Sequence, residues 1–221
     1  MLPGEREKLE FQNRLLDWFE RARRDFPWRS QSDPYAILIA EKLLQQTAAR
    51  DVVVQAYEQF LHQYPTPHHL AAANVSDIEE IIKSLGLTYR AKELQAMAQE
   101  LVAHYGGEVP RDLKELIALP GVGDYSARAV LSFAFGENVP IVDTNVARLL
   151  YRLYGIPGPL PANPARKKSL IELAGELIPA GQSRDFNLAI LDLCAQICRP
   201  TDPTCPDCPI KVYCSYFMRE G

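Results

Sequence analysis

Apolar residues recur every three or four positions along most of the chain, a spacing that gathers them on one face of a helix. No stretch alternates apolar and polar residues for long enough to predict a β-sheet. Glycine and proline interrupt the pattern at 26–28, 64–67, 106–107, 120–121 and 155–161. The pattern therefore predicts an all-α protein of about ten helices, over residues 7–24, 35–47, 50–63, 76–84, 90–104, 112–118, 124–135, 145–154, 165–178 and 184–197.

Composition indicates the broad class of protein to which the chain belongs. The 221 residues are 47% hydrophobic, which is enough to bury a core in one large or two small domains. The first residues, MLPGEREKLE, carry charge where a signal peptide needs an apolar segment, and no stretch reaches the roughly 18 apolar residues of a membrane span. We expect a soluble intracellular protein of the cytoplasm or nucleoid, with no membrane association. The net charge of −4 neither indicates nor excludes a nucleic-acid partner, because a local basic groove can lie on an acidic protein.

Four cysteines near the end of the chain carry the strongest chemical signal. Cys198, Cys205, Cys208 and Cys214 follow the spacing C-x6-C-x2-C-x5-C. Disulfides are disfavoured, because the chain has five cysteines and no export signal. A zinc site is the alternative, although zinc more often uses two separated C-x2-C pairs, whereas one compact run here encircles its ligand. We favour a [4Fe–4S] cluster in the loop 198–214. Cys194 lies one helical turn earlier and is expected to be a small buried side chain.

A second pattern is the stretch LPGVGDYSARAVL, which predicts two helices joined by a glycine hairpin. Gly121 and Gly123, with Val122 between them, would leave backbone N–H groups at a helix N-terminus with no side chain in front of them. A phosphate group could approach such a site closely. The alternative is an ordinary helical corner in which the glycines only supply positive φ.

Taken together, LPGVGDYSA, the following VDTNVAR and the cysteine loop resemble the helix-hairpin-helix DNA glycosylases of the endonuclease III superfamily. The segments FPWR, DPYAILIAEKLLQQT, GGEVPRDL and DFNLAILDLCAQIC are more similar to its mismatch branch, which holds the MutY adenine glycosylases and the Mig thymine glycosylases. The resemblance implies a six-helix barrel that carries the hairpin, over residues 31–141. Residues 1–30 and 142–221 would then form a terminal helical domain with the cluster loop. It also implies a double-stranded DNA partner with a mismatched or damaged base, bound by a monomer.

The same resemblance assigns catalytic roles. In this family the target nucleotide leaves the duplex, and the aspartate after the hairpin helix, here Asp143, faces its sugar. A carboxylate there would stabilise the positive charge that develops as the glycosidic bond breaks. The alternative is that Asp143 or Thr144 only caps the next helix. Glu41, at the edge of an apolar helical stripe, matches a glutamate of the mismatch branch and would act as a general acid, its pKa raised by desolvation. A boundary glutamate on a solvated face is the alternative.

Tyr125 stands where bifunctional members of the superfamily have a lysine that forms a Schiff base with the sugar. A phenol cannot form an imine, so we expect base removal without strong strand cleavage. An aromatic residue packed between helices is the alternative. Gln45 and Gln46 are candidates to fill the gap left by a flipped base, or else cap a helix. Arg128, and with it Arg90 and Lys92, are candidate phosphate ligands, although exposed cations are most often only solvated.

The resemblance narrows the target base without fixing it. The chain stops soon after Cys214, where similar MutY proteins continue into a further domain, and LQQTAAR departs from their usual Q-Q-T-Q. These features favour removal of thymine or uracil opposite guanine, as in the Mig branch. The sequence Gln45-Gln46-Thr47 is of the adenine type, so an adenine glycosylase remains the alternative. The sequence also fits a non-catalytic iron–sulfur DNA-binding protein, or a helical zinc protein without a DNA role.

Overall fold

The computed structural model describes residues 4–45, 51–86 and 88–220, and within these ranges every regular element is helical, which confirms the all-α prediction. The α-helices are α1 (Glu5–Ala22), α2 (Pro34–Leu44), α3 (Asp51–Gln63), α4 (Pro67–Ala71), α5 (Val75–Ile82), α6 (Ala91–Tyr105), α7 (Leu113–Ala118), α8 (Asp124–Phe133), α9 (Thr144–Tyr154), α10 (Lys168–Leu177), α11 (Ser183–Gln196) and α12 (Ser215–Glu220). Short 3-10 turns link several of them, including one at Thr88–Arg90. Helices α4 and α12 have no counterpart in the sequence prediction.

The chain divides into two compact units. One unit is continuous and runs from Asp25 to Phe135, and the other combines Met1–Arg24 with Gly136–Gly221. No described helix is both long and apolar enough to cross a membrane.

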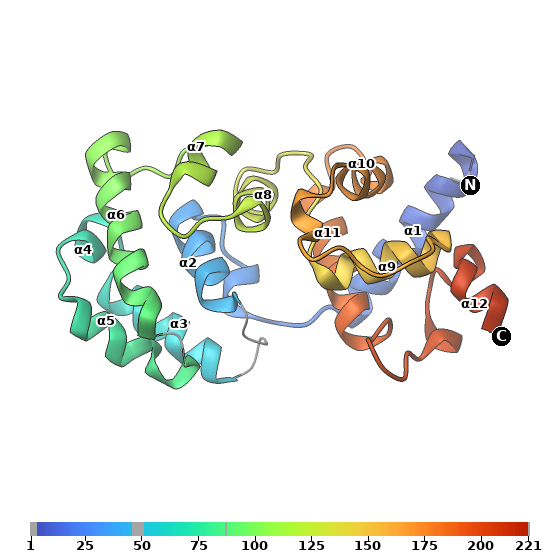
Figure 1. Cartoon of the computed structure of the whole chain (residues 1–221), viewed down its shortest axis with the longest axis horizontal. Helices are drawn as coiled ribbons and strands as arrows, with labels where there is room; N and C mark the ends of the chain where they lie inside the picture. Colours follow the sequence, from blue (N-terminus) through green and yellow to red (C-terminus); the bar gives the residue numbers. More distant parts are fainter. Residues whose placement is uncertain (1–3, 46–50, 87, 221) are drawn as a thin grey trace. The chain divides into compact units, whose positions relative to one another are not determined.

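The continuous unit contains α2 to α8, with α2 as its most buried helix (Figure 1). Asp33 begins α2, because its carboxylate accepts hydrogen bonds from the backbone N–H groups of Tyr35 and Ala36. Helix α2 packs against α3 and α8, while α4 and α5 pack against α6. This packing holds the end of α2 and the start of α8 in one core.

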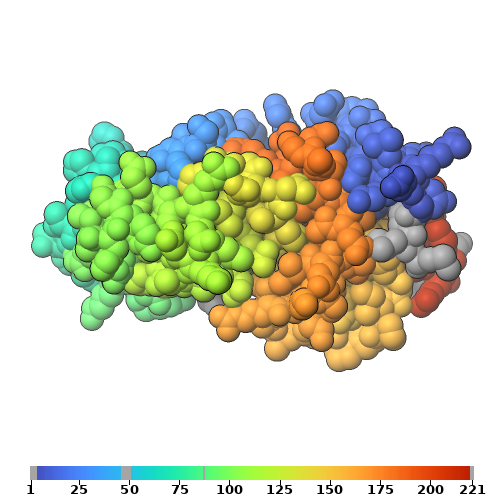
Figure 2. All heavy atoms as spheres, turned by 90° about the horizontal axis from the view of Figure 1, so that it is seen from above, coloured from blue at the N-terminus to red at the C-terminus, as the bar shows by residue number. Residues whose placement is uncertain are grey.

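The discontinuous unit joins the two ends of the chain. Helix α1 packs on α11, and the backbone N–H and Nε of Arg24 both donate to the fully buried carboxylate of Asp192, at 2.9 and 2.6 Å. The Phe11 ring meets the Tyr213 ring edge-on with 5.7 Å between centroids, and Figures 1 and 2 show the N-terminal helix beside the C-terminal segment. The N-terminal helix is therefore part of the support for the cysteine loop.

Candidate functional site

The hairpin between α7 and α8 has the geometry that the glycine pair predicts. Gly121 adopts a left-handed φ of 69°, and the N–H of Val122 closes the turn on the carbonyl of Leu119 at 3.1 Å. A Cβ on Gly121 would displace the end of the Lys42 side chain, and the left-handed φ would strain any larger residue there. Gly123 differs, because its φ is −100° and a Cβ would meet nothing within 4 Å. The protein itself does not require glycine at this N-cap of α8, whereas a closely approaching anion would.

The C-terminal end of α2 is bonded to this hairpin. Lys42 donates from Nζ to the carbonyl of Gly121 at 2.7 Å and to the Glu93 carboxylate at 3.3 Å. Gln45 donates from Nε2 to Oγ of Ser126 at 3.1 Å. Burial lowers the pKa of Lys42, and the charge of Glu93 opposes that effect. The side chain of Gln45 therefore faces the hairpin, and Gln46 lies outside the described residues.

Arg90 also belongs to this cluster. Its side chain is buried, and Nη1 donates to the carbonyls of Gln45 at 2.8 Å and Lys42 at 3.3 Å. A helix end leaves its last carbonyls without intrahelical donors, and tertiary packing brings the guanidinium of Arg90 to two of them. Arg90 thus caps the end of α2 and is buried, whereas the sequence suggested an exposed phosphate ligand.

Three other predicted site residues lie in the same unit. Glu41 is buried on α2 with 7% of its surface exposed, which places it deeper than the edge of the apolar stripe suggests. Tyr125 lies half-buried in the first turn of α8. Arg128, one turn later, has an Nε that is shielded from solvent without a hydrogen-bond partner among the described residues. Glu41, Gln45, the hairpin and Tyr125 thus all belong to the unit of residues 25–135, in which α2 packs on α8.

Asp143 lies in the other unit and begins α9. Its Oδ1 accepts from the backbone N–H of Val146 at 2.7 Å, and its Oδ2 accepts from Nδ2 of Asn145 at 2.8 Å. The side chain is half-buried. The carboxylate is therefore a helix cap with a fixed orientation, and capping leaves its negative charge in place for chemistry.

The contacts of Asp143 continue toward the cysteine loop. Nη1 of Arg148 donates to Oδ1 of Asn145 at 3.0 Å, while its Nη2 and Nε donate to the carbonyl of Cys198 at 2.9 and 3.1 Å. A single arginine thus joins the residue that orients Asp143 to the first cysteine of the loop.

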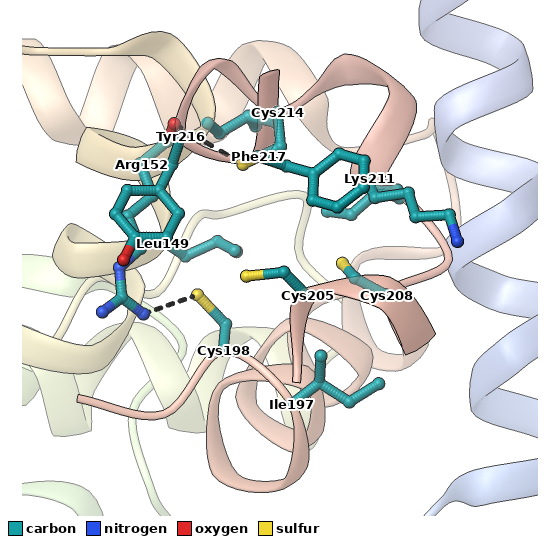
Figure 3. A pocket seen from close by; sticks show the side chains of 12 residues that line it. Leu149, Arg152, Ile197, Cys198, Cys205, Cys208, Lys211, Cys214, Tyr216 and Phe217 are labelled. Carbon is teal, nitrogen blue, oxygen red and sulfur yellow. Dashed lines mark hydrogen bonds between the residues drawn. The ribbon is translucent and has the colours of Figure 1, made fainter. Parts of the chain in front are cut away.

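The four cysteines of the C-x6-C-x2-C-x5-C loop line one cavity (Figure 3). Cys198, Cys205, Cys208 and Cys214 point into it from the loop, and its apolar wall includes Leu149, Leu153, Ile197 and Ile210. Arg152 donates from Nη1 to Sγ of Cys198 at 3.4 Å. Burial raises the pKa of Cys208 to about 12, so that the neutral thiol is the favoured form when nothing is bound.

The cavity that the four thiols line has a volume of about 20 Å³. Within the described ranges, no three His, Cys, Asp or Glu side chains converge closely enough to hold one metal ion. All five cysteines are described, and none forms a disulfide. Cys194 is buried outside this cavity lining, where its Sγ donates to the carbonyl of Asn145 at 3.4 Å.

Sequence reasoning missed several residues of these sites: Lys42, Asn145, Arg148 and Arg152. Asn145 and Arg148 lie within the VDTNVAR segment and are three positions apart, so their shared helical face was the available signal. Lys42 gave no such signal, because a lysine on an apolar helix ordinarily extends its ammonium to solvent.

Comparison with known proteins places these features in a family. Residues 39–177 match the HhH-GPD superfamily base excision DNA repair protein family. A thymine/uracil-DNA glycosylase of Methanothermobacter thermautotrophicus is 40% identical over 210 residues, covering 95% of this chain and 94% of the relative. A human adenine DNA glycosylase is 35% identical over 218 residues, covering 95% of this chain and 40% of the relative. A solved structure of a thermostable thymine-DNA glycosylase matches with a TM-score of 0.89 and 39% identity, covering 97% of this chain and 98% of that one.

Proposed function

Because the chain belongs to the HhH-GPD superfamily of base excision DNA repair proteins, we infer that it is a DNA glycosylase that removes thymine or uracil opposite guanine. The observation that carries this proposal is the match of 94% of the length of a thymine/uracil-DNA glycosylase at 40% identity. The adenine glycosylase is matched over 40% of its length, which leaves adenine as the second candidate base.

The proposed reaction hydrolyses one bond. The bond between C1′ and the base nitrogen breaks, the oxygen of water bonds to C1′, and the products are a free base and an abasic sugar. The carboxylate of Asp143 stabilises the positive charge that develops on the sugar, and its hydrogen bonds from Asn145 and Val146 fix its orientation beforehand. Glu41 is the proposed proton donor to the leaving base, since it is the buried carboxyl of α2.

The glycine hairpin is the proposed binding site for the DNA backbone. Gly123 leaves open space in front of the first turn of α8, where the backbone N–H groups of a helix attract a phosphate. Tyr125 follows within that turn and offers no amine to the sugar, so the proposed enzyme removes bases without strong strand cleavage.

A [4Fe–4S] cluster is the proposed cofactor, held by Cys198, Cys205, Cys208 and Cys214. The support is the cavity that these four thiols line. When bound, such a cluster supplies a four-point anchor for the loop and a one-electron redox centre. The hydrogen bond from Arg152 to Sγ of Cys198 would orient this cysteine as a ligand of the cluster.

The experiment that tests the function uses five labelled duplexes, carrying T·G, U·G, A·G, A opposite 8-oxoguanine, and T·A. Each is incubated with excess protein and then treated with hot alkali, which breaks the strand at any lost base. We expect alkali-dependent cleavage of the T·G and U·G duplexes only. Cleavage confined to the adenine duplexes would replace the proposed base with adenine, and tight binding without loss of any base would indicate a non-catalytic DNA-binding protein.

A further inference from the structure

Lys42 is a buried cation for which the proposed reaction has no use. Its side chain is 1% exposed, on a helix whose neighbouring positions are almost entirely apolar. Removing an ammonium from water is unfavourable unless it gains close partners, and a hydrophobic side chain of similar size is often at least as stable in such a place. The burial of Lys42 therefore calls for an explanation beyond packing.

The partners of Lys42 all lie around the hairpin. Its Nζ donates to the carbonyl of Gly121 at 2.7 Å, which is shorter than its 3.3 Å contact with Oε2 of Glu93. The Glu93 side chain is 46% exposed, so water screens this ion pair, whereas the ammonium itself is shielded from solvent. The stronger described bond of Lys42 is thus the one to the hairpin backbone.

A second set of bonds reinforces the same connection. Gln45, one turn after Lys42, donates to Oγ of Ser126 in the first turn of α8 at 3.1 Å. Arg90 holds the end of α2 through the carbonyls of Lys42 and Gln45. Hydrogen bonds therefore join the end of α2 to the start of α6 and to the hairpin, and the side chains of Lys42 and Arg90 are both buried.

We propose that Lys42 is a positioning residue for DNA binding, which holds the carbonyl of Gly121 and so aims the N–H groups of the hairpin and of α8 at a DNA phosphate. Its buried charge also makes the potential at the anion site more positive, an effect that low local polarity strengthens. This inference rests on the proposed function, in which the hairpin binds the DNA strand.

The proposal separates DNA affinity from folding. In Lys42→Met an apolar chain of similar length fills the same space, and the carbonyl of exposed Gly121 and the half-exposed Glu93 can be solvated by water. We therefore expect a melting temperature equal to or above that of the parent protein, with a Kd for duplex DNA raised about tenfold. The rate of base removal at saturating DNA should change less than about threefold, since Lys42 acts on binding and not on the reacting atoms.

The test measures the Kd for a T·G duplex, the single-turnover rate and the melting temperature of each full-length variant. Lys83→Met is the matched control, because it deletes one lysine charge of the same unit at a side chain that is 68% exposed. This control should leave the Kd within about twofold. Equal Kd values for the two lysine variants would overturn the proposal, as would a loss of folding stability in Lys42→Met with no change in Kd.

A third variant decides the outcome if Lys42→Met does not fold. Glu93→Gln keeps the bond from Lys42 to Gly121 and removes the opposing negative charge, so the Kd should stay the same or fall, and weaker binding would overturn the proposal. Parent protein that neither binds nor processes any mismatched duplex would refute the proposed function instead. If the parent protein binds DNA and Lys42→Met binds it equally well, only the role of Lys42 is refuted.

Discussion

Asn145 donates a hydrogen bond from Nδ2 to Oδ2 of Asp143 at 2.8 Å, and this bond fixes the carboxylate oxygen that the cap of α9 leaves uncommitted. We expect Asn145→Ala to lower the rate of base removal at saturating DNA about tenfold, because a carboxylate free to rotate stabilises the transition state less well. The Kd for the duplex should remain within about twofold of the parent value. Single-turnover kinetics and equilibrium binding measure the two effects.

Asn163→Ala is the matched control for this prediction, since Asn163 is an exposed asparagine of the same unit whose side chain caps no helix. An equal loss of rate in both variants, or a loss of DNA affinity that accounts for the slower reaction of Asn145→Ala, would contradict the positioning role.

Asp143→Asn separates the cap of α9 from the charge. Asparagine caps helices as well as aspartate does, so the melting temperature should stay close to that of the parent protein. Base removal should fall by two or more orders of magnitude, about 3 kcal/mol, because the charge that opposes the developing cation is gone. A melting curve measures the effect on stability, and a single-turnover assay measures the effect on the rate. A nearly normal rate of base removal would show that Asp143 only caps α9.

The cysteine cavity predicts a coloured protein. Anaerobically purified protein should be brown with broad visible absorption from thiolate-to-iron charge transfer, and Cys205→Ser should lose this colour and much of the DNA affinity. Cys194→Ser is the control, because Cys194 does not line the cavity of the other four, and it should keep the colour. Iron and zinc analysis accompanies the spectra. Colourless parent protein with stoichiometric zinc would refute the cluster.

Tyr125→Lys tests which face of α8 meets the sugar. A lysine at this position would bring an amine to C1′, and its neutral fraction would form a Schiff base that leads to strand cleavage. Borohydride should then trap the variant on DNA, whereas the parent protein and the control Tyr125→Phe should show neither trapping nor cleavage above background. If Tyr125→Lys removes bases normally and is never trapped, Tyr125 points away from the sugar.

Tyr57 predicts a change in stability at alkaline pH. Its Oη is buried without a hydrogen-bond partner among the described residues, and burial raises its pKa to about 12. Since the folded pKa lies above the ordinary value of 10, ionisation of this phenol does not affect stability below pH 10, and the free energy of unfolding falls as the pH rises from 10 through 12.

Tyr57→Phe removes the unpaired hydroxyl and keeps the ring that packs edge-on against Trp28. It should raise the free energy of unfolding by about 1 kcal/mol at neutral pH, and by more above pH 10. Tyr35→Phe is the opposite case, because Oη of Tyr35 donates to the carbonyl of Tyr64 at 3.0 Å, and its loss should lower the free energy of unfolding by about 1 kcal/mol. Denaturant unfolding at several pH values measures both.

The sequence predicted the helices that carry the site because local signals define them. The expected helix 145–154 is α9, which begins at Thr144 after the cap Asp143, and the expected 124–135 is α8, which begins after the second glycine of the hairpin. The expected 35–47 ends earlier, at Leu44, because Arg90 comes from a distant segment to bond the carbonyl of Gln45. No pattern within α2 could reveal that donor.

The short helices escaped prediction for a related reason. Helix α4 has five residues and α12 has six, too few for an apolar repeat to stand out, and both depend on packing against α6 and α9. Among the site residues, Glu41, Asp143 and the four cysteines were proposed from motif spacing and the family resemblance, and the four cysteines do line one cavity. The bond from Arg148 to the carbonyl of Cys198 required the packed structure, since it joins residues 50 positions apart in the chain. The domain limits at 30 and 141 and the catalytic roles stay predictions.

The discontinuous unit sets an order of events during synthesis. Residues 25–135 form a continuous unit that can fold as soon as it leaves the ribosome, whereas the apolar face of α1, with Phe11, Leu15 and Phe19, must wait for α11. The nascent chain therefore carries an uncovered amphipathic helix at its leading end while most of the protein is still being made. Chains that stop before α11 is made would therefore keep this apolar face exposed and be prone to aggregation.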